Sequence, residues 1–128
     1  MSASPNPFGW IEIYVQDMPR AVRFYETVLR RTLNELADPS GQSQMMAFTM
    51  SDQPTPGASG ALVKMEGVPS GGNSVIPYFI CDDCAEEASR VVAAGGKVQQ
   101  PKMAIGQYGH IALVVDTEGN TVGLHSMR

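Results

Sequence analysis

The sequence predicts an α+β protein built from two βαβββ modules. Two observations lead to this prediction. A strand-like stretch runs into a stretch with helical spacing over residues 8–29, and the same order returns over residues 75–94. Short apolar stretches separated by turn residues follow each pair, so the order of elements repeats although the letters do not. With 128 residues, the chain has the length of a single domain.

The first strand is predicted over residues 8–15, where side chains alternate between two faces. One face carries a carboxylate between two aromatic residues, and the other carries β-branched residues. The first set is Trp10, Glu12 and Tyr14, and the second is Ile11, Ile13 and Val15. We expect the β-branched face to pack on the helices. The other face is expected to line a cavity or an interface, because a carboxylate between Trp and Tyr is unusual on an open surface.

A helix is predicted to follow and to end at Leu29, with Asp17 as its N-cap and Pro19 in its first turn. Its apolar residues recur with the spacing of one helix face, and they are Met18, Ala21, Val22, Tyr25, Val28 and Leu29. The remaining strands of this half are predicted at 30–36, 45–50 and 61–65, with a turn at 38–41, a loop at 51–60 and a linker at 66–74.

The second half is predicted to begin with an apolar strand at 75–81 and a helix at 83–94. Asp83 is its candidate N-cap, and the glycine pair that starts at Gly95 ends it. The later elements are strands at 97–100, 109–115 and 121–126 and a turn at 116–120. Asp83 therefore has the same place in the second half, at the N-cap of the helix, that Asp17 has in the first.

Composition narrows the classes of function. The chain is 43% hydrophobic and 17% charged, with a net charge of −4 and a pI near 5.0. Without a basic cluster, nucleic acid is not expected as a partner. No apolar run reaches the length of a membrane span, and the first residues lack the pattern of a signal peptide, so no membrane partner is expected. Two cysteines without a secretory signal predict a cytoplasmic protein without disulfides.

Three motifs resemble one family. Residues Val15 to Leu29 match the pattern V-x-D-x-x-R-A-x-x-F-Y-x-x-V-L, after which Arg30 replaces a glycine. The second half contains AAGGKV from Ala93 and YGHIALVVDTEGN from Tyr108, with Thr117 in place of a proline. The chain therefore resembles the vicinal oxygen chelate superfamily, the glyoxalase, bleomycin-resistance and dioxygenase fold, over residues 8–127.

The resemblance implies a single domain whose curled mixed sheets form a cup, with the helices packed outside. We expect a flexible arm at 1–7, one module at 8–66, a second at 74–127, and a linker at 67–73. The cup is expected to form within one chain or across a swapped homodimer. Metal-using relatives hold a divalent ion at four positions, which fall here on Trp10, Lys64, Ile76 and Gly123. None of these is a normal ligand, so neither a metal nor another cofactor is expected.

The cup itself is predicted to bind a small organic molecule. The expected ligand-binding residues are Trp10, Tyr14, Met46, Phe48, Lys64, Tyr78 and His125. Desolvation by the aromatic side chains would suit Glu12 to act as a general base or to anchor a cationic group. A structural ion pair of Glu12 with Lys64 or an arginine is the alternative. The pattern leaves open which face His110 occupies.

Three functions follow as hypotheses. The first is a metal-free small-molecule binder that could act as a proton-transfer lyase or isomerase through Glu12. The second is a non-catalytic, drug-sequestering protein of the bleomycin-resistance type. The third is a metal-dependent lyase or extradiol dioxygenase. The C-x-x-C motif at Cys81 and Cys84 is interpreted as a coincidence, with Cys84 as a candidate reactive thiol at a helix start.

Overall fold

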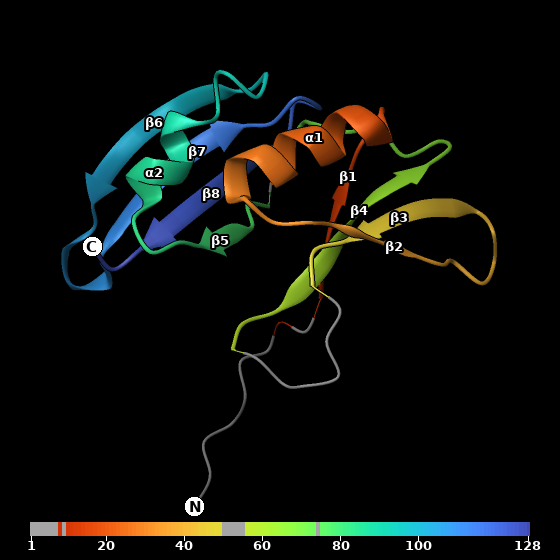
Figure 1. Ribbon diagram of the computed structural model, residues 1–128, viewed down its shortest axis with the longest axis horizontal. Coiled ribbons are helices and arrows are strands. Elements are labelled where there is room, and N and C mark those ends of the chain that lie inside the picture. The colour runs from red at the N-terminus through yellow and green to blue at the C-terminus, as the bar shows by residue number, and fades with distance from the viewer. Residues whose placement is uncertain (1–7, 9, 50–55, 74) are drawn as a thin grey trace, which may run out of the picture.

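Each half of the chain forms a four-stranded sheet with one helix (Figure 1). The structure is a computed structural model and describes residues 8, 10–49, 56–73 and 75–128. The first half contains β1 (Trp10–Tyr14), α1 (Met18–Leu29), β2 (Asn34–Leu36), β3 (Ser43–Ala47) and β4 (Ser59–Met65). The second contains β5 (Tyr78–Ile80), α2 (Cys84–Ser89), β6 (Lys97–Ala104), the short 3-10 helix η1 (Gly106–Tyr108), β7 (His110–Val115) and β8 (Thr121–Ser126). This order confirms the predicted α+β class. The expected arm at 1–7 and part of the expected loop at 51–60 lie outside the described residues.

The two sheets have the same topology. Their strand orders are β1-β4-β3-β2 and β5-β8-β7-β6, and the first strand of each pairs in parallel with the last. The register aligns Glu12 with Ala61 in the first sheet and Tyr78 with Gly123 in the second. Because side chains of aligned residues share a face, this register decides which residues accompany Glu12.

Helix α1 has the predicted bounds and cap. The Asp17 carboxylate accepts a hydrogen bond from the backbone N–H of Arg20 at 3.1 Å, and the apolar face that includes Phe24 and Tyr25 is buried. The helix ends at Leu29, and its C-cap is Arg30, whose φ of 52° and ψ of 51° are left-handed. Glycine adopts this conformation without the steric conflict that Cβ creates, so Arg30 strains the position.

Helix α2 is shorter than predicted, because it ends at Ser89 instead of continuing to residue 94. Tighter three-residue turns replace it, as the N–H of Val91 bonds to the carbonyl of Ala88 at 3.3 Å. The Arg90 side chain leaves this segment and donates its Nε–H to the carbonyl of Val28 at 3.0 Å, near the end of α1. The two helices therefore lie side by side on the same side of the sheets (Figure 1).

One hydrophobic core joins the two halves. Ile13 and Val15 of the first half are buried in the same cluster as Leu124 of the second, which confirms that the β-branched face packs inward. The Phe79 ring lies 5.8 Å from that of Tyr25 and 5.3 Å from that of Phe48, measured between centroids. These aromatic contacts between the halves add to the stabilisation that apolar burial provides, so each half contributes to the stability of the other. No helix in the described part of the chain is long and apolar enough to cross a membrane.

Candidate functional site

Strand β1 presents an acid–aromatic triplet, which consists of Trp10, Glu12 and Tyr14. These side chains leave the same face of the strand, opposite the core. The indole Nε1–H of Trp10 donates to Glu12 Oε2 at 3.2 Å, and the Tyr14 hydroxyl donates to Glu12 Oε1 at 2.9 Å. Each carboxylate oxygen therefore has one neutral donor and keeps capacity to accept another hydrogen bond.

The Glu12 carboxylate shifts the pKa of its tyrosine neighbour. The hydrogen bond to Glu12 raises the pKa of Tyr14, and burial and the charge of Glu12 raise it further. Glu12 is exposed, so the desolvation expected from its aromatic neighbours is absent within this chain. The arrangement suits an anchor for a hydrogen-bond donor or a cation better than a base that must lose its charge.

The second sheet places aromatic and apolar side chains on the equivalent face. Tyr78, Ile80 and His125 share this face, because Tyr78 aligns with Gly123 and Ile80 aligns with His125. A Cβ atom at Gly123 would lie 2.2 Å from the Tyr78 ring, so the ring occupies the space of the missing side chain. His125 Nε2 contacts the carbonyl oxygen of Tyr108 at 2.7 Å. We call these aligned sheet faces, with the triplet, the helix-free face.

Three predicted ligand-binding residues lie away from the helix-free face. Met46 and Phe48 pack against the core, and Lys64 follows Val63, which aligns with Tyr14. Since neighbours on a strand point to opposite faces, Lys64 is on the other side of the sheet from Glu12. The alternative for Glu12, an ion pair with Lys64 or an arginine, is not formed among the described residues. His110 aligns with buried Ser126, so it lies on the helix side of its sheet.

The residues of the helix-free face do not fit the metal site that the resemblance implies. Glu12 aligns with Ala61, and Tyr78 aligns with Gly123, so the corresponding strands supply one carboxylate and no second ligand beside it. Among the described residues, no group of three or more His, Cys, Asp or Glu side chains could hold a metal ion. Lys64 is at one of the four positions where metal-using relatives hold the ion, but it lies on the opposite face of the sheet from Glu12. The absence of a metal stays a prediction.

The two cysteines of the C-x-x-C motif are both free and buried. Burial raises the pKa of the Cys81 thiol to about 12, and the nearby Glu87 adds to this effect. Cys84 is 0% exposed. A buried thiol is inaccessible to reagents, so the position at the helix start does not make Cys84 a reactive thiol in this structure.

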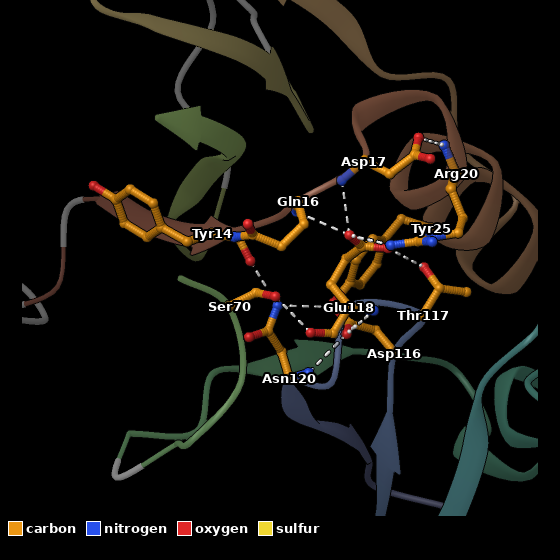
Figure 2. Close-up of polar contacts among 10 residues, drawn as sticks. All are labelled: Tyr14, Gln16, Asp17, Arg20, Tyr25, Ser70, Asp116, Thr117, Glu118 and Asn120. Atoms are coloured by element: carbon orange, nitrogen blue, oxygen red, sulfur yellow. Dashed lines mark hydrogen bonds and ion pairs between the residues drawn. The ribbon is translucent and has the colours of Figure 1, made fainter. Parts of the chain in front are cut away.

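A buried polar network, absent from the sequence-based prediction, joins the two halves (Figure 2). We call it the junction network, and it consists of the turn residues Asp116, Glu118 and Asn120 with their partners. Glu118 Oε1 accepts the backbone N–H groups of Gln16 at 2.8 Å and Asp17 at 2.9 Å. These N–H groups lie where β1 leads into α1, so the second half holds the start of the first helix.

Arg20 donates further hydrogen bonds to the Glu118 carboxylate. Arg20 Nε donates to Glu118 Oε2 at 2.7 Å, and Nη2 donates to Oε1 at 2.9 Å, which forms a bidentate ion pair. Burial alone would raise the pKa of Glu118, but the hydrogen bonds from Arg20 and the two backbone N–H groups outweigh it and lower the pKa to about 2. Glu118 therefore stays charged although its side chain is 0% exposed.

The rest of the junction network surrounds Asp116. The Tyr25 hydroxyl donates to Asp116 Oδ2 at 2.6 Å, and the backbone N–H of Asn120 donates to Oδ1 at 2.8 Å. Asn120 Nδ2 in turn donates to the carbonyl of Tyr14 at 2.8 Å. The carbonyl of Tyr14 thereby links this network to the strand of the triplet. The main residues of this network fall within the motifs V-x-D-x-x-R-A-x-x-F-Y and YGHIALVVDTEGN, but neither motif indicated that they contact one another.

Comparison with known proteins identifies the relatives of the chain. The family model described as the Glyoxalase/Bleomycin resistance protein/Dioxygenase superfamily matches residues 8–124. Proteins named "Putative glyoxylase CFP32" from Mycobacterium tuberculosis and Mycobacterium bovis are 27% identical over 126 residues. The match covers 94% of this chain and 44% of each of those proteins, so the chain spans less than half the length of these curated relatives.

Solved structures of similar fold include glyoxalase I from Zea mays, with a TM-score of 0.72 and 23% identity over 99% of this chain and 48% of that one. A glyoxalase-related enzyme from Fulvimarina pelagi has a TM-score of 0.66 and 18% identity, and the match covers 95% of this chain and 88% of that one. A glyoxylase/bleomycin resistance protein/dioxygenase domain from Frankia sp. EAN1pec has a TM-score of 0.68 and 15% identity over 98% of this chain and all of that one. At these identities the likeness shows the fold alone.

Proposed function

Because the chain belongs to the glyoxalase/bleomycin resistance protein/dioxygenase superfamily, we propose that it binds a small organic molecule on its helix-free face with Glu12 as the polar anchor. The acid–aromatic triplet is the observation that supports this proposal. Two side-chain donors fix the Glu12 carboxylate, which is exposed. A fixed carboxylate between aromatic side chains matches a ligand that has a cationic or hydrogen-bond-donating group on an apolar body.

The apolar surface around the anchor supports the same proposal. Trp10 is 41% exposed, Tyr78 is 45% exposed and Ile80 is 74% exposed. Exposed apolar side chains gathered on one face are typical of binding sites and of subunit interfaces. We therefore also propose a homodimer in which a second copy covers part of this face. Analytical ultracentrifugation at micromolar concentration tests the dimer, and a monomeric mass would contradict it.

Proton transfer is the second candidate function. The names of the curated relatives and of the Zea mays enzyme motivate a lyase or isomerase activity, with Glu12 as the base. A ligand or second copy that covers Glu12 would supply the desolvation that this role requires. The bleomycin-resistance alternative predicts binding without turnover. The metal-dependent alternative predicts about one equivalent of metal per chain, which elemental mass spectrometry would detect.

Free buried cysteines favour a reducing compartment, and we propose the cytoplasm.

Trp10 provides the assay, because it is the only tryptophan in the chain and belongs to the triplet. Its fluorescence is recorded while a panel of apolar organic cations and their neutral analogues is titrated. We expect at least one cation to change the emission, and Glu12→Gln to weaken its binding about tenfold, as for the loss of a hydrogen bond to a charged group.

The matched control is Glu35→Gln, which makes the same charge change at an exposed position of the same sheet. Binding should be unaffected in this variant. Equal weakening in the two variants would mean that only net charge matters, and no response from any compound would contradict the site. Product analysis of the bound compound then separates a binder, which returns it unchanged, from a lyase or isomerase.

A further inference from the structure

A cavity of about 960 Å³ lies between the edge strands β1 and β5, and we call it the edge cavity. Strand β1 contributes Ile11 and Ile13, whose side chains point away from the face of Glu12. Phe48 and Phe79 add aromatic surface, and their ring centroids are 5.3 Å apart. The walls of the edge cavity are therefore largely apolar. Tyr78 and Ile80 of the helix-free face also line it, whereas none of the three residues of the acid–aromatic triplet does.

The second half supplies an acidic wall. Asp82 and Glu87 both line the edge cavity, the first just before α2 and the second within it. Glu87 Oε1 is buried and has no hydrogen bond of ordinary geometry, although the Cys81 thiol lies near enough for a weak interaction with the Glu87 carboxylate to raise the pKa of the thiol. A buried carboxylate oxygen without a donor is unfavourable, so this oxygen has an unmet need for a hydrogen bond. Glu87 lines the edge cavity, so a hydrogen-bond donor bound there would lie close to this carboxylate.

The charges around the edge cavity favour a cation. The charged residues among its described lining are Arg31, Asp82 and Glu87, so the carboxylates outnumber the guanidinium. Arg31 comes from the first half, and its Nη1 already donates to Thr49 Oγ1 at 3.0 Å. The thiol beside Glu87 belongs to Cys81, whose burial raises its pKa to about 12, so it does not bring a competing negative charge.

We propose that the edge cavity binds a protonated amine with an apolar body, and that the ammonium group donates a hydrogen bond to Glu87. An ammonium group has only donors, and Glu87 Oε1 is an acceptor without one. The apolar body packs against Phe48, Phe79 and the isoleucines of β1. This is a second site of the molecule, and it does not depend on the function proposed for Glu12.

Phenethylamine and 2-phenylethanol make a matched pair of probes, because they share the apolar body and differ in the charged group. Each is titrated into the ¹⁵N-labelled full chain, and amide shifts are followed by NMR. We expect the amine to shift amides of residues 79–87 and of Phe48, and to bind more tightly than the alcohol. Equal binding of the two probes, or shifts confined to Trp10 and its neighbours, would overturn the proposal.

Variants identify the acceptor. Glu87→Gln should weaken the amine about tenfold and leave the alcohol unchanged, because only the charge-assisted hydrogen bond is lost. Glu86→Gln is the control, since it removes the same charge from an exposed position of the same helix. Glu12→Gln should leave the amide shifts around α2 in place, which separates this site from the triplet.

A second substitution keeps the test decisive if Glu87→Gln disturbs the fold. Asp82 is exposed and lines the edge cavity, so Asp82→Asn should fold normally and weaken the amine by a smaller factor. Undiminished amine binding in both Asp82→Asn and a folded Glu87→Gln would refute the acidic wall as the recognition element. Circular dichroism and the melting temperature of each variant report whether it is folded.

Discussion

Replacing Glu118 by glutamine should destabilise the protein by about 3 kcal/mol at pH 7. Glutamine has the shape of the protonated acid but lacks the charge that Arg20 and two backbone N–H groups stabilise. The pKa of Glu118 falls from an ordinary value of 4.5 to about 2 in the folded state. Each pKa unit corresponds to about 1.36 kcal/mol, so this lowering corresponds to roughly 3 kcal/mol of stability from the charged form.

The sign of the pH dependence follows from the same values. A lowered pKa means that the folded state favours the carboxylate, so the full stabilisation is present above the unfolded-state value of 4.5. The stabilisation is lost as the pH falls from 4.5 toward 2, because the unfolded chain then binds a proton that the folded protein does not yet bind. The wild type and Glu118→Gln should therefore become more similar in stability as the pH approaches 2.

Urea unfolding, followed by circular dichroism from pH 7 to pH 2, measures both effects. Glu66→Gln is the control, because Glu66 is exposed. A loss below about 1 kcal/mol at pH 7 would refute the assigned strength, since that is the range of an ordinary surface ion pair. A difference between wild type and Glu118→Gln that stays constant with pH would refute the titration argument.

Three further predictions concern the fold that supports the site. Tyr25→Phe should lower the free energy of unfolding by about 1–2 kcal/mol, because it leaves buried Asp116 without a 2.6 Å hydrogen bond; a melting temperature equal to that of the wild type would contradict this. Arg30→Gly should raise the free energy of unfolding by about 0.5–1 kcal/mol, since glycine relieves the left-handed φ of 52°; a lower urea midpoint would show that the arginine side chain matters more than the strain. Gly60→Ala should cost about 1–3 kcal/mol or more, because its Cβ would lie 2.0 Å from the carbonyl oxygen of Ile11; unchanged thermal unfolding would mean that the strands separate easily.

The elements with a clear period were predictable from the sequence. Strict alternation around Glu12 gave the two faces of β1, and the Asp17 cap with its helical spacing gave the bounds of α1. In β4 the run around Leu62 and Val63 is apolar on both faces, so no alternation indicates the direction of Lys64. In β3 two adjacent methionines place apolar side chains on both faces, so the sequence does not indicate the direction of Met46 either.

The junction network could not be predicted because it depends on contacts between residues far apart in the sequence. Glu118 in a short turn looks like an ordinary solvated acid until the turn is placed against Gln16 and Arg20. Likewise, the exposure of Glu12 depends on what covers the helix-free face, which the spacing of one strand does not report. Sequence periodicity describes single elements, whereas burial and ion pairing depend on how the halves pack.

The linker between the halves is attached along much of its length. The Ser70 hydroxyl donates to the carbonyl of Glu118 at 2.6 Å, the Gly71 N–H donates to Asn120 Oδ1 at 2.6 Å, and Gln16 Nε2 donates to the carbonyl of Val68 at 3.2 Å. Two chains can trade halves only after these bonds and the shared core have opened. Such an exchange would therefore proceed at the rate of unfolding and not at the rate of encounter. Whichever pairing of halves forms first during folding would then persist for the lifetime of the native state.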